Sequence, residues 1–441
     1  MEVLVMIGQL LLGLSILIVL HEGGHFLAAR AFGIKVEKFY LFFDAWGFKL
    51  FSFTYKEVEY GIGWLPLGGY VKIAGMIDES MDTAAMALPA QPYEFRSKPA
   101  WQRLIVMLGG VTVNIIVGIF IFWMLTYKYG ETYIPNNQLK FGIAPGIVGQ
   151  QMGLQGGDKI LAINGKKLER FDDLRSSKVL IDKANITVLR NGETKTIEVP
   201  ADILNTLSDA SPTDFITPRI KAEVDSVAVG GYAAKAGLLK GDALLSVNGE
   251  SAIFFDQLKT VLTAQKNQTV QITVLRNGGV FTIPVMVSGE GTIGFVVKQL
   301  DIKTKTTEFG FFEALPFAAS KALGTLIDNA KGIGKIFKGE IRADKALSGP
   351  VAIARKLYGG VFDWARFWSI TGLLSMALAL MNLLPIPALD GGHSVFLIVE
   401  MIKGKPLSDK FMERAQMVGF VILAALMVFA LGNDIFKAIM R

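Results

Sequence analysis

Four long stretches of the chain contain no charged residue, and polar, glycine-bearing regions separate them. The stretches are 3–20, 104–127, 367–384 and 417–431. With their flanking residues they approach the roughly 20 residues that a helix needs to cross the hydrocarbon core of a bilayer. The pattern predicts a multi-pass α-helical membrane protein with about four transmembrane helices, of which the third ends near Pro385 and Pro387 because proline breaks a helix.

The region between the second and third apolar stretches contains one module twice. The heptapeptide 186–192 recurs unchanged at 272–278, and the Gly-Asp, Asn-Gly and Phe-Asp pairs at 157, 164 and 171 return at 241, 248 and 255. Each copy alternates β-branched runs with Asn-Gly turns and carries one helix that is predicted to start at its Phe-Asp pair. The pattern predicts two inserted α+β domains with exposed strand edges.

Composition and charge agree with a membrane protein. Hydrophobic residues make up 51% of the 441, which is too apolar for an ordinary soluble enzyme. The chain has no cysteine, so disulfides and thiolate metal sites are excluded. Its net charge of +6 is spread over loops beside the apolar stretches, which indicates lipid headgroups and not nucleic acid as the partner.

Basic residues also predict the orientation. Lys and Arg are concentrated in the loops 31–103 and 403–410. By the positive-inside rule these two loops are cytoplasmic, and both termini and the region 128–365 then lie on the outer side.

The first apolar stretch ends in His21-Glu22-Gly23-Gly24-His25. Residues four apart share one face of a helix, so His21 and His25 can bind one cation while Glu22 lies beside it without binding. Neutral histidine nitrogens are good zinc ligands, and polar residues at membrane depth usually mark a functional site. The alternative is that both histidines bind polar partners inside a helix bundle.

A third ligand is predicted near the end of the third apolar stretch. Asp390 follows two prolines and precedes two glycines, so the backbone there is not expected to be helical. Non-helical backbone at membrane depth lies inside protein or against a water-filled cavity, which a hydrolytic site needs. His393 is an alternative ligand three residues later.

The two motifs together resemble the site-2 protease family of intramembrane zinc metalloproteases. The resemblance is carried by the HEGGH sequence and by Asn382-x-x-Pro-x-Pro-x-Leu-Asp390-Gly, and it extends over essentially the whole chain. It implies that His21, His25 and Asp390 bind Zn²⁺, that Glu22 is the general base, and that Asn382 is a catalytic contact to the substrate or the oxyanion. One departure is Val111, which stands where the family has proline, and we assign no role to Asn114 three residues later.

Two further segments resemble known peptide-binding elements. The repeated pattern Gly-Leu-x-x-Gly-Asp is similar to the PDZ domains of bacterial membrane and periplasmic proteases, which capture extended peptides by strand addition. This places a peptide groove of the second copy beside Gly230 and Gly231. Alternatively, the pair is a rigid spacer or size filter.

The segment 57–72 combines strand-forming residues with glycines that permit close backbone approach. Its Pro-Leu-Gly-Gly-Tyr-Val-Lys core resembles the membrane-associated β-loop of the site-2 proteases, which implies substrate binding by strand addition. The substrate-binding residues expected on this basis are Gly63, Pro66, Gly68, Gly69 and Tyr70. A β-hairpin that only packs on the first helix is the alternative.

The sequence thus predicts a zinc-dependent intramembrane endopeptidase of the bacterial inner membrane that cleaves transmembrane segments of single-pass proteins, such as anti-sigma factors or signal-peptide remnants. Its expected regions are 1–127 with the first two membrane helices and the β-loop, 128–218 and 219–304 with the PDZ-like domains, 305–365 as an amphipathic connector, and 366–441 with the last two helices. The expected partners are the bilayer, single-pass substrates, and peptide C-termini or extended segments at the PDZ-like domains. A membrane-tethered PDZ scaffold without proteolytic activity is the alternative function.

Overall fold

The chain folds into two compact units in a computed structural model, which describes residues 2–66, 68–76, 89–180, 184–200, 202–207, 215–299, 302–346 and 349–439. The first unit comprises Met1–Glu131 and Glu308–Arg441, and the second comprises Thr132–Thr307. Each unit has hydrophobic cores of its own.

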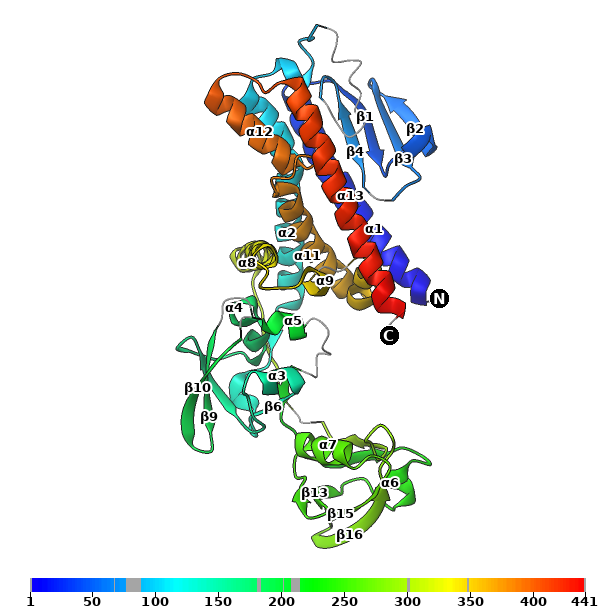
Figure 1. The fold of residues 1–441 in the computed structure, drawn as a ribbon, viewed down its shortest axis with the longest axis vertical. Coiled ribbons are helices and arrows are strands. Elements are labelled where there is room, and N and C mark those ends of the chain that lie inside the picture. Colours follow the sequence, from blue (N-terminus) through cyan, green and yellow to red (C-terminus); the bar gives the residue numbers. More distant parts are fainter. Residues whose placement is uncertain are drawn as a thin grey trace. The chain divides into compact units, whose positions relative to one another are not determined.

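Helices dominate the first unit (Figure 1). They are α1 (Glu2–Ala31), α2 (Ala100–Tyr129), α8 (Phe311–Phe337), α9 (Ala343–Ala346), α10 (Pro350–Ile353), the π-helix η7 (Ala354–Tyr358), α11 (Trp364–Leu383), α12 (Asp390–Lys403) and α13 (Asp409–Ile439). Among the described residues, α1, α2, α11 and the Lys410–Phe436 part of α13 are long and apolar enough to cross a bilayer. They correspond to the four predicted stretches, and together with the β-sheets they make this an integral membrane protein with β domains.

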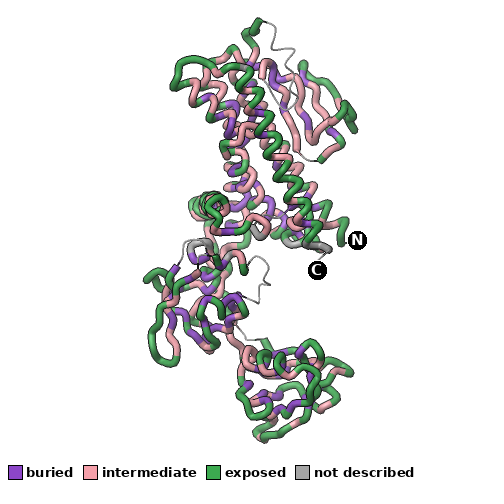
Figure 2. Tube along the Cα trace, viewed as in Figure 1, coloured by how far each residue is buried: buried purple, intermediate pink, exposed green. Residues whose placement is uncertain are grey.

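Helix α2 lies at the centre of this unit and packs against α1, α8, α11 and α12. Its backbone meets that of α1 at Gly109 and Gly24, where a Cβ atom on either glycine would overlap with the carbonyl group of the other. Small residues allow such close helix contacts inside a membrane. By contrast, most of α13 is exposed (Figure 2), as expected for a helix with apolar side chains that face lipid.

A four-stranded sheet follows α1 in the first unit. Its strands are β1 (Val36–Leu41), β2 (Lys49–Tyr55), β3 (Val58–Gly63) and β4 (Tyr70–Ile73), arranged in the order β2-β3-β1-β4. Strand β1 is parallel to β3 and antiparallel to β4. Strand β4 is therefore an edge strand, and it contacts α1.

The second unit contains the two sequence repeats, which have equivalent elements. The first repeat has β6 (Ile143–Pro145), α3 (Ile147–Gln151), β7 (Lys159–Ile163), β8 (Lys166–Lys167), the 3-10 helix η5 (Phe171–Arg175), α4 (Ser177–Leu180), β9 (Asn185–Arg190), β10 (Glu193–Glu198), α5 (Ile203–Leu207) and β11 (Ile216–Pro218). The second has β12 (Val224–Val227), α6 (Tyr232–Lys235), β13 (Ala243–Val247), β14 (Glu250–Ser251), α7 (Phe255–Ala264), β15 (Thr269–Arg276), β16 (Gly279–Met286) and β17 (Phe295–Val297). The flanking strands β5 (Glu131–Tyr133) and β18 (Lys305–Thr307) form a further two-stranded sheet.

The main sheets of the two repeats have the same topology, β8-β7-β9-β10 and β14-β13-β15-β16. The predicted Asn-Gly turns are present in both repeats: Asn164, Asn191, Asn248 and Asn277 adopt the positive φ that such a turn requires. The predicted helix begins at Phe255 in the second repeat, where the Gln257 side chain accepts a hydrogen bond from the Phe254 N–H at 3.2 Å. In the first repeat the prediction is only partly right: the segment is a short 3-10 helix, and the shorter Asp173 occupies the position that matches Gln257.

Each repeat pairs a buried aspartate with a partly exposed arginine. Arg276 donates two hydrogen bonds of 2.6 Å to the fully buried Asp242, which also accepts a hydrogen bond of 2.9 Å from the Leu239 N–H. Burial raises the pKa of the Asp242 carboxyl, but the hydrogen bonds from Arg276 and Leu239 outweigh burial and hold this pKa below its usual value. Arg190 and Asp158 form the same pair in the first repeat, at 2.8 and 2.7 Å.

We expect Arg276→Met to destabilise the second repeat at pH 7, because the buried Asp242 loses its charged partner. The folded-state pKa of Asp242 is lowered, so its ionisation stabilises the fold above the usual carboxyl pKa of about 3.9, and this stabilisation is lost as the pH falls further. Amide hydrogen exchange in β13 and β15, measured at pH 7 and again well below the usual carboxyl pKa of about 3.9, reports both effects. Arg190→Met is the control and should affect only β7 and β9; unchanged protection of β15 in Arg276→Met would contradict the prediction.

Candidate metal centre

The structure brings His21, His25 and Asp390 together. Helix α1 continues to Ala31, so both histidines lie on one of its faces, and Asp390 is the first residue of α12. The Nε2 atoms of His21 and His25 are each 3.2 Å from Oδ2 of Asp390 and 3.3 Å from each other. The three potential ligand atoms therefore form a nearly equilateral triangle, although their residues lie as far apart in the sequence as 21 and 390.

This triangle fits a zinc ion. Tetrahedral zinc with Zn–N distances of about 2.0–2.1 Å places its ligand atoms about 3.3 Å apart. Oδ2 of Asp390 is buried and makes no hydrogen bond to the described residues, so its lone pairs are available to a cation. Nδ1 of His25 lies 2.8 Å from the Val106 carbonyl oxygen and donates to it, which leaves the lone pair on Nε2 directed at the triangle.

Helix α2 can approach the two imidazoles because residue 110 is glycine. A Cβ atom on Gly110 would overlap with Nε2 of His25 and would lie 2.5 Å from Cε1 of His21. Any side chain at this position would enter the space between the ligands. The close contact between Gly24 and Gly109 one residue earlier holds the same two helix backbones together.

Glu22 and Asn382 lie next to the triangle on different elements. The Glu22 carboxylate faces the backbone N–H of Val71 in β4. Nδ2 of Asn382, at the end of α11, is 3.0 Å from Nε2 of His21. A carboxylate and an amide therefore flank the candidate metal ligands, as hydrolysis of a peptide bond requires.

The backbone near Asp390 differs in part from the expectation. Residues 384–389 are not helical, as the two prolines predict, but Asp390, Gly391 and Gly392 belong to α12. A Cβ atom on Gly391 would overlap with the carbonyl groups of Leu383 and Leu384. The glycines therefore allow α12 to pack tightly on the end of α11, and they do not interrupt the helix.

His393 contributes no atom to the triangle. It lies one turn after Asp390 on α12, and its ring makes an edge contact with Phe396, with 6.4 Å between the ring centroids.

The predicted substrate-binding residues fall into different environments. Gly69 lies between α1 and β1, and a Cβ atom there would be 2.7 Å from the Tyr40 carbonyl oxygen and 3.5 Å from Cγ of Glu22. Gly63 is buried against the backbone of Phe43, and Gly68 lies on its ring. These glycines thus permit close packing within the sheet region.

The remaining predicted binding residues are distributed over both units. Tyr70 stacks on Tyr40 and donates a hydrogen bond of 2.8 Å to Asp44, whereas Pro66 is exposed. Gly230 and Gly231 lie in the second unit between β12 and α6, where Gly230 has a positive φ of 75°.

Sequence reasoning assigned no role to three positions on α2 that face the histidines: Val106, Gly110 and Asn114. Nδ2 of Asn114 is 3.1 Å from Nδ1 of His21. The three positions are spaced by four residues, so they lie along one face of a helix. That spacing is visible in the sequence, but nothing local indicates which helix this face contacts.

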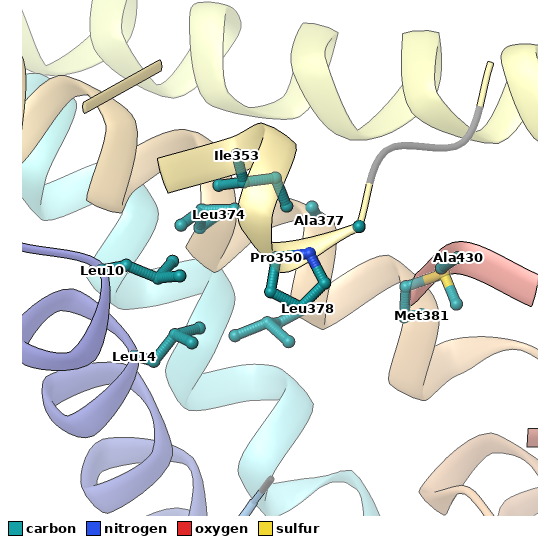
Figure 3. A pocket seen from close by; sticks show the side chains of 10 residues that line it. Leu10, Leu14, Pro350, Ile353, Leu374, Ala377, Leu378, Met381 and Ala430 are labelled. Atoms are coloured by element: carbon teal, nitrogen blue, oxygen red, sulfur yellow. The ribbon is translucent and has the colours of Figure 1, made fainter. Parts of the chain in front are cut away.

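An apolar cavity of about 300 Å³ lies in the same unit (Figure 3). Side chains from α1, α10, α11 and α13 line it, including Leu10, Leu14, Pro350, Leu374 and Met381. Met381 directly precedes Asn382, so the cavity lies along the same helix as one of the residues at the metal centre.

Comparison with known proteins agrees with this geometry. The family model described as peptidase family M50 matches residues 9–426. The regulator of sigma-E protease RseP of Escherichia coli K12 is 29% identical, with 97% of this chain and 98% of the relative covered. The regulator of sigma E protease of Haemophilus influenzae is also 29% identical, with 98% of each chain covered. RseP of Salmonella typhimurium is 28% identical over 96% of this chain and 97% of its own. The family match over nearly the whole length shows that this chain belongs to peptidase family M50 and is a metalloprotease of the site-2 type.

Proposed function

We propose that this chain is a zinc-dependent endopeptidase that cleaves transmembrane segments of single-pass membrane proteins. The observation that carries this proposal is the triangle of His21, His25 and Asp390, with sides of 3.2–3.3 Å, on helices of a membrane-embedded unit. The adjacent Glu22 and Asn382 supply the further groups that peptide hydrolysis needs.

In this proposal His21, His25 and Asp390 hold the ion. Bound zinc supplies a Lewis acid that polarises the scissile carbonyl and makes water a nucleophile near neutral pH. Glu22 takes a proton from the attacking water at its free carboxylate oxygen and returns it to the leaving amine nitrogen. The amide of Asn382 donates a hydrogen bond to the substrate carbonyl oxygen as negative charge develops on it.

Strand β4 is the proposed site of substrate binding. The amides of a transmembrane helix are hydrogen-bonded within that helix, so the segment to be cut must first become extended. Among the described strands, none pairs with the outer edge of β4, and the Val71 N–H of β4 faces Glu22. A substrate strand added to this edge would run past the general base. The apolar cavity is proposed to take side chains of the substrate helix.

We place the metal centre towards the cytoplasmic side of a bacterial inner membrane. Arg103, at the start of α2, forms an ion pair with Glu400, near the end of α12, so the two basic loops lie at one end of the first unit. This arrangement supports the positive-inside prediction. The PDZ-like domains would then face the periplasm.

The relatives named as sigma-E regulators support substrates of the anti-sigma-factor type, and signal-peptide remnants are the second proposed class. At the second PDZ-like domain, the positive φ of Gly230 and the position of Gly231 before α6 support a loop that receives a peptide end. A size filter remains the alternative role of these domains.

Metal removal tests the proposal. The purified full-length protein is reconstituted into bilayers with a panel of single-pass anchors and signal peptides. We expect ortho-phenanthroline to abolish cleavage and added zinc to restore it, whereas the non-chelating meta isomer has no effect. Mass spectrometry of the products should place the cut inside the apolar segment. Cleavage that resisted chelation, or that occurred only outside this segment, would contradict the proposal.

A further inference from the structure

We propose that Asn114 is a positioning residue for the metal centre. Its side-chain oxygen accepts the Nδ1–H of His21, and this hydrogen bond directs the lone pair of His21 Nε2 at the ion. This inference rests on the proposed metal centre and adds a fourth residue to it. Asn114 lies in the middle of α2, is fully buried, and has its amide 3.1 Å from Nδ1 of His21.

The two histidines are held by one face of α2 in the same manner. Nδ1 of His25 donates to the carbonyl oxygen of Val106, and Nδ1 of His21 meets the side chain of Asn114, two turns further along the helix. Gly110, between these two positions, leaves space for both rings. A ligand histidine is usually fixed by a hydrogen bond at its other nitrogen, which sets both its tautomer and the orientation of the ring.

An amide is well suited to this place because it has both a donor and an acceptor end. With Nδ2 towards His21, as in the structure, Nδ1 of His21 can only accept. When Nε2 binds a cation, the ring proton must lie on Nδ1, which then needs an acceptor. Oδ1 of Asn114 is buried without a hydrogen-bond partner among the described residues. A half-turn of the amide brings it to Nδ1.

The backbone of Asn114 is also fixed. Its carbonyl oxygen accepts a hydrogen bond of 2.7 Å from Oγ of Ser375 on α11, the helix that carries Asn382. Nδ2 of Asn382 lies on the opposite nitrogen of the same ring, at 3.0 Å from Nε2 of His21. The imidazole of His21 thus lies between two amides, one from α2 and one from α11.

Three variants of the full-length protein test this assignment by zinc affinity, measured in competition with a chromophoric chelator. Asn114→Leu keeps the approximate size of the side chain but removes the acceptor, and we expect its zinc Kd to rise about 10- to 100-fold. Asn114→Asp retains an acceptor, so its Kd should stay within about threefold of the wild type or fall below it. Thr112→Val, at an exposed position of the same helix, is the matched control and should not change the Kd.

A role in packing alone would not distinguish leucine from aspartate in this way. A wild-type Kd in Asn114→Leu would overturn the assignment, and so would a Kd in Asn114→Asp as weak as that of the leucine variant. If Asn114→Leu does not fold, the zinc Kd of Asn114→Asp tests the assignment by itself. A loss of zinc affinity of tenfold or more in Asn114→Asp would exclude the acceptor role of Asn114. A wild-type protein that bound no zinc would contradict the metal centre itself, and the role of Asn114 with it.

Discussion

Replacing Glu22 with glutamine is expected to lower the rate of peptide cleavage by about 10²- to 10⁴-fold while the protein keeps its zinc. Glutamine has the same shape, and its side-chain oxygen can still face the Val71 N–H. It cannot take a proton from water. The cleavage rate is measured on a reconstituted single-pass substrate. The zinc content of the same preparation is measured by mass spectrometry.

Glu57→Gln is the matched control for this variant. Glu57 is exposed at the turn between β2 and β3 and is 3.7 Å from Lys35, so its loss should leave the cleavage rate unchanged. A wild-type cleavage rate in Glu22→Gln would exclude Glu22 as the general base. Loss of zinc from Glu22→Gln would instead indicate that its carboxylate binds the ion.

Removal of the Asp390 carboxylate is expected to weaken zinc binding by more than about 100-fold and to abolish cleavage. Asp390 supplies one of the three corners of the triangle, and the two histidines left behind are too few to hold a catalytic zinc ion. Zinc content after dialysis and the Kd from chelator competition should both show the loss in Asp390→Ala.

His393→Ala is the control for Asp390→Ala. Because His393 has no atom in the triangle, this variant should keep its zinc. The opposite pattern, in which Asp390→Ala binds zinc normally and His393→Ala does not, would make His393 the third ligand. That result would also require α12 to be rotated relative to its orientation in the structure, since the two residues are three positions apart on the same helix.

Local patterns in the sequence were sufficient to predict much of the fold. Long apolar stretches predicted the candidate membrane helices, because their length and hydropathy suffice to span a bilayer. The Asn-Gly pairs at 191 and 277 predicted their hairpins, since only a few residues tolerate a positive φ. The helix expected at Phe171 was predicted only in part, because the same Phe-Asp pair begins a 3-10 helix in the first repeat and an α-helix in the second.

The metal centre depends on contacts that local sequence patterns do not predict. The spacing of His21 and His25 determined by itself that their imidazoles share one helix face, because the period of an α-helix is fixed by its backbone hydrogen bonds. The sequence predicted Asp390 as the third ligand, with His393 as an alternative. Only the tertiary structure decided that Asp390 and not His393 completes the triangle, that Gly110 makes room for the rings, and that Asn114 contacts His21. These contacts join residues on different helices, and they depend on how closely whole helices pack, which no local pattern encodes.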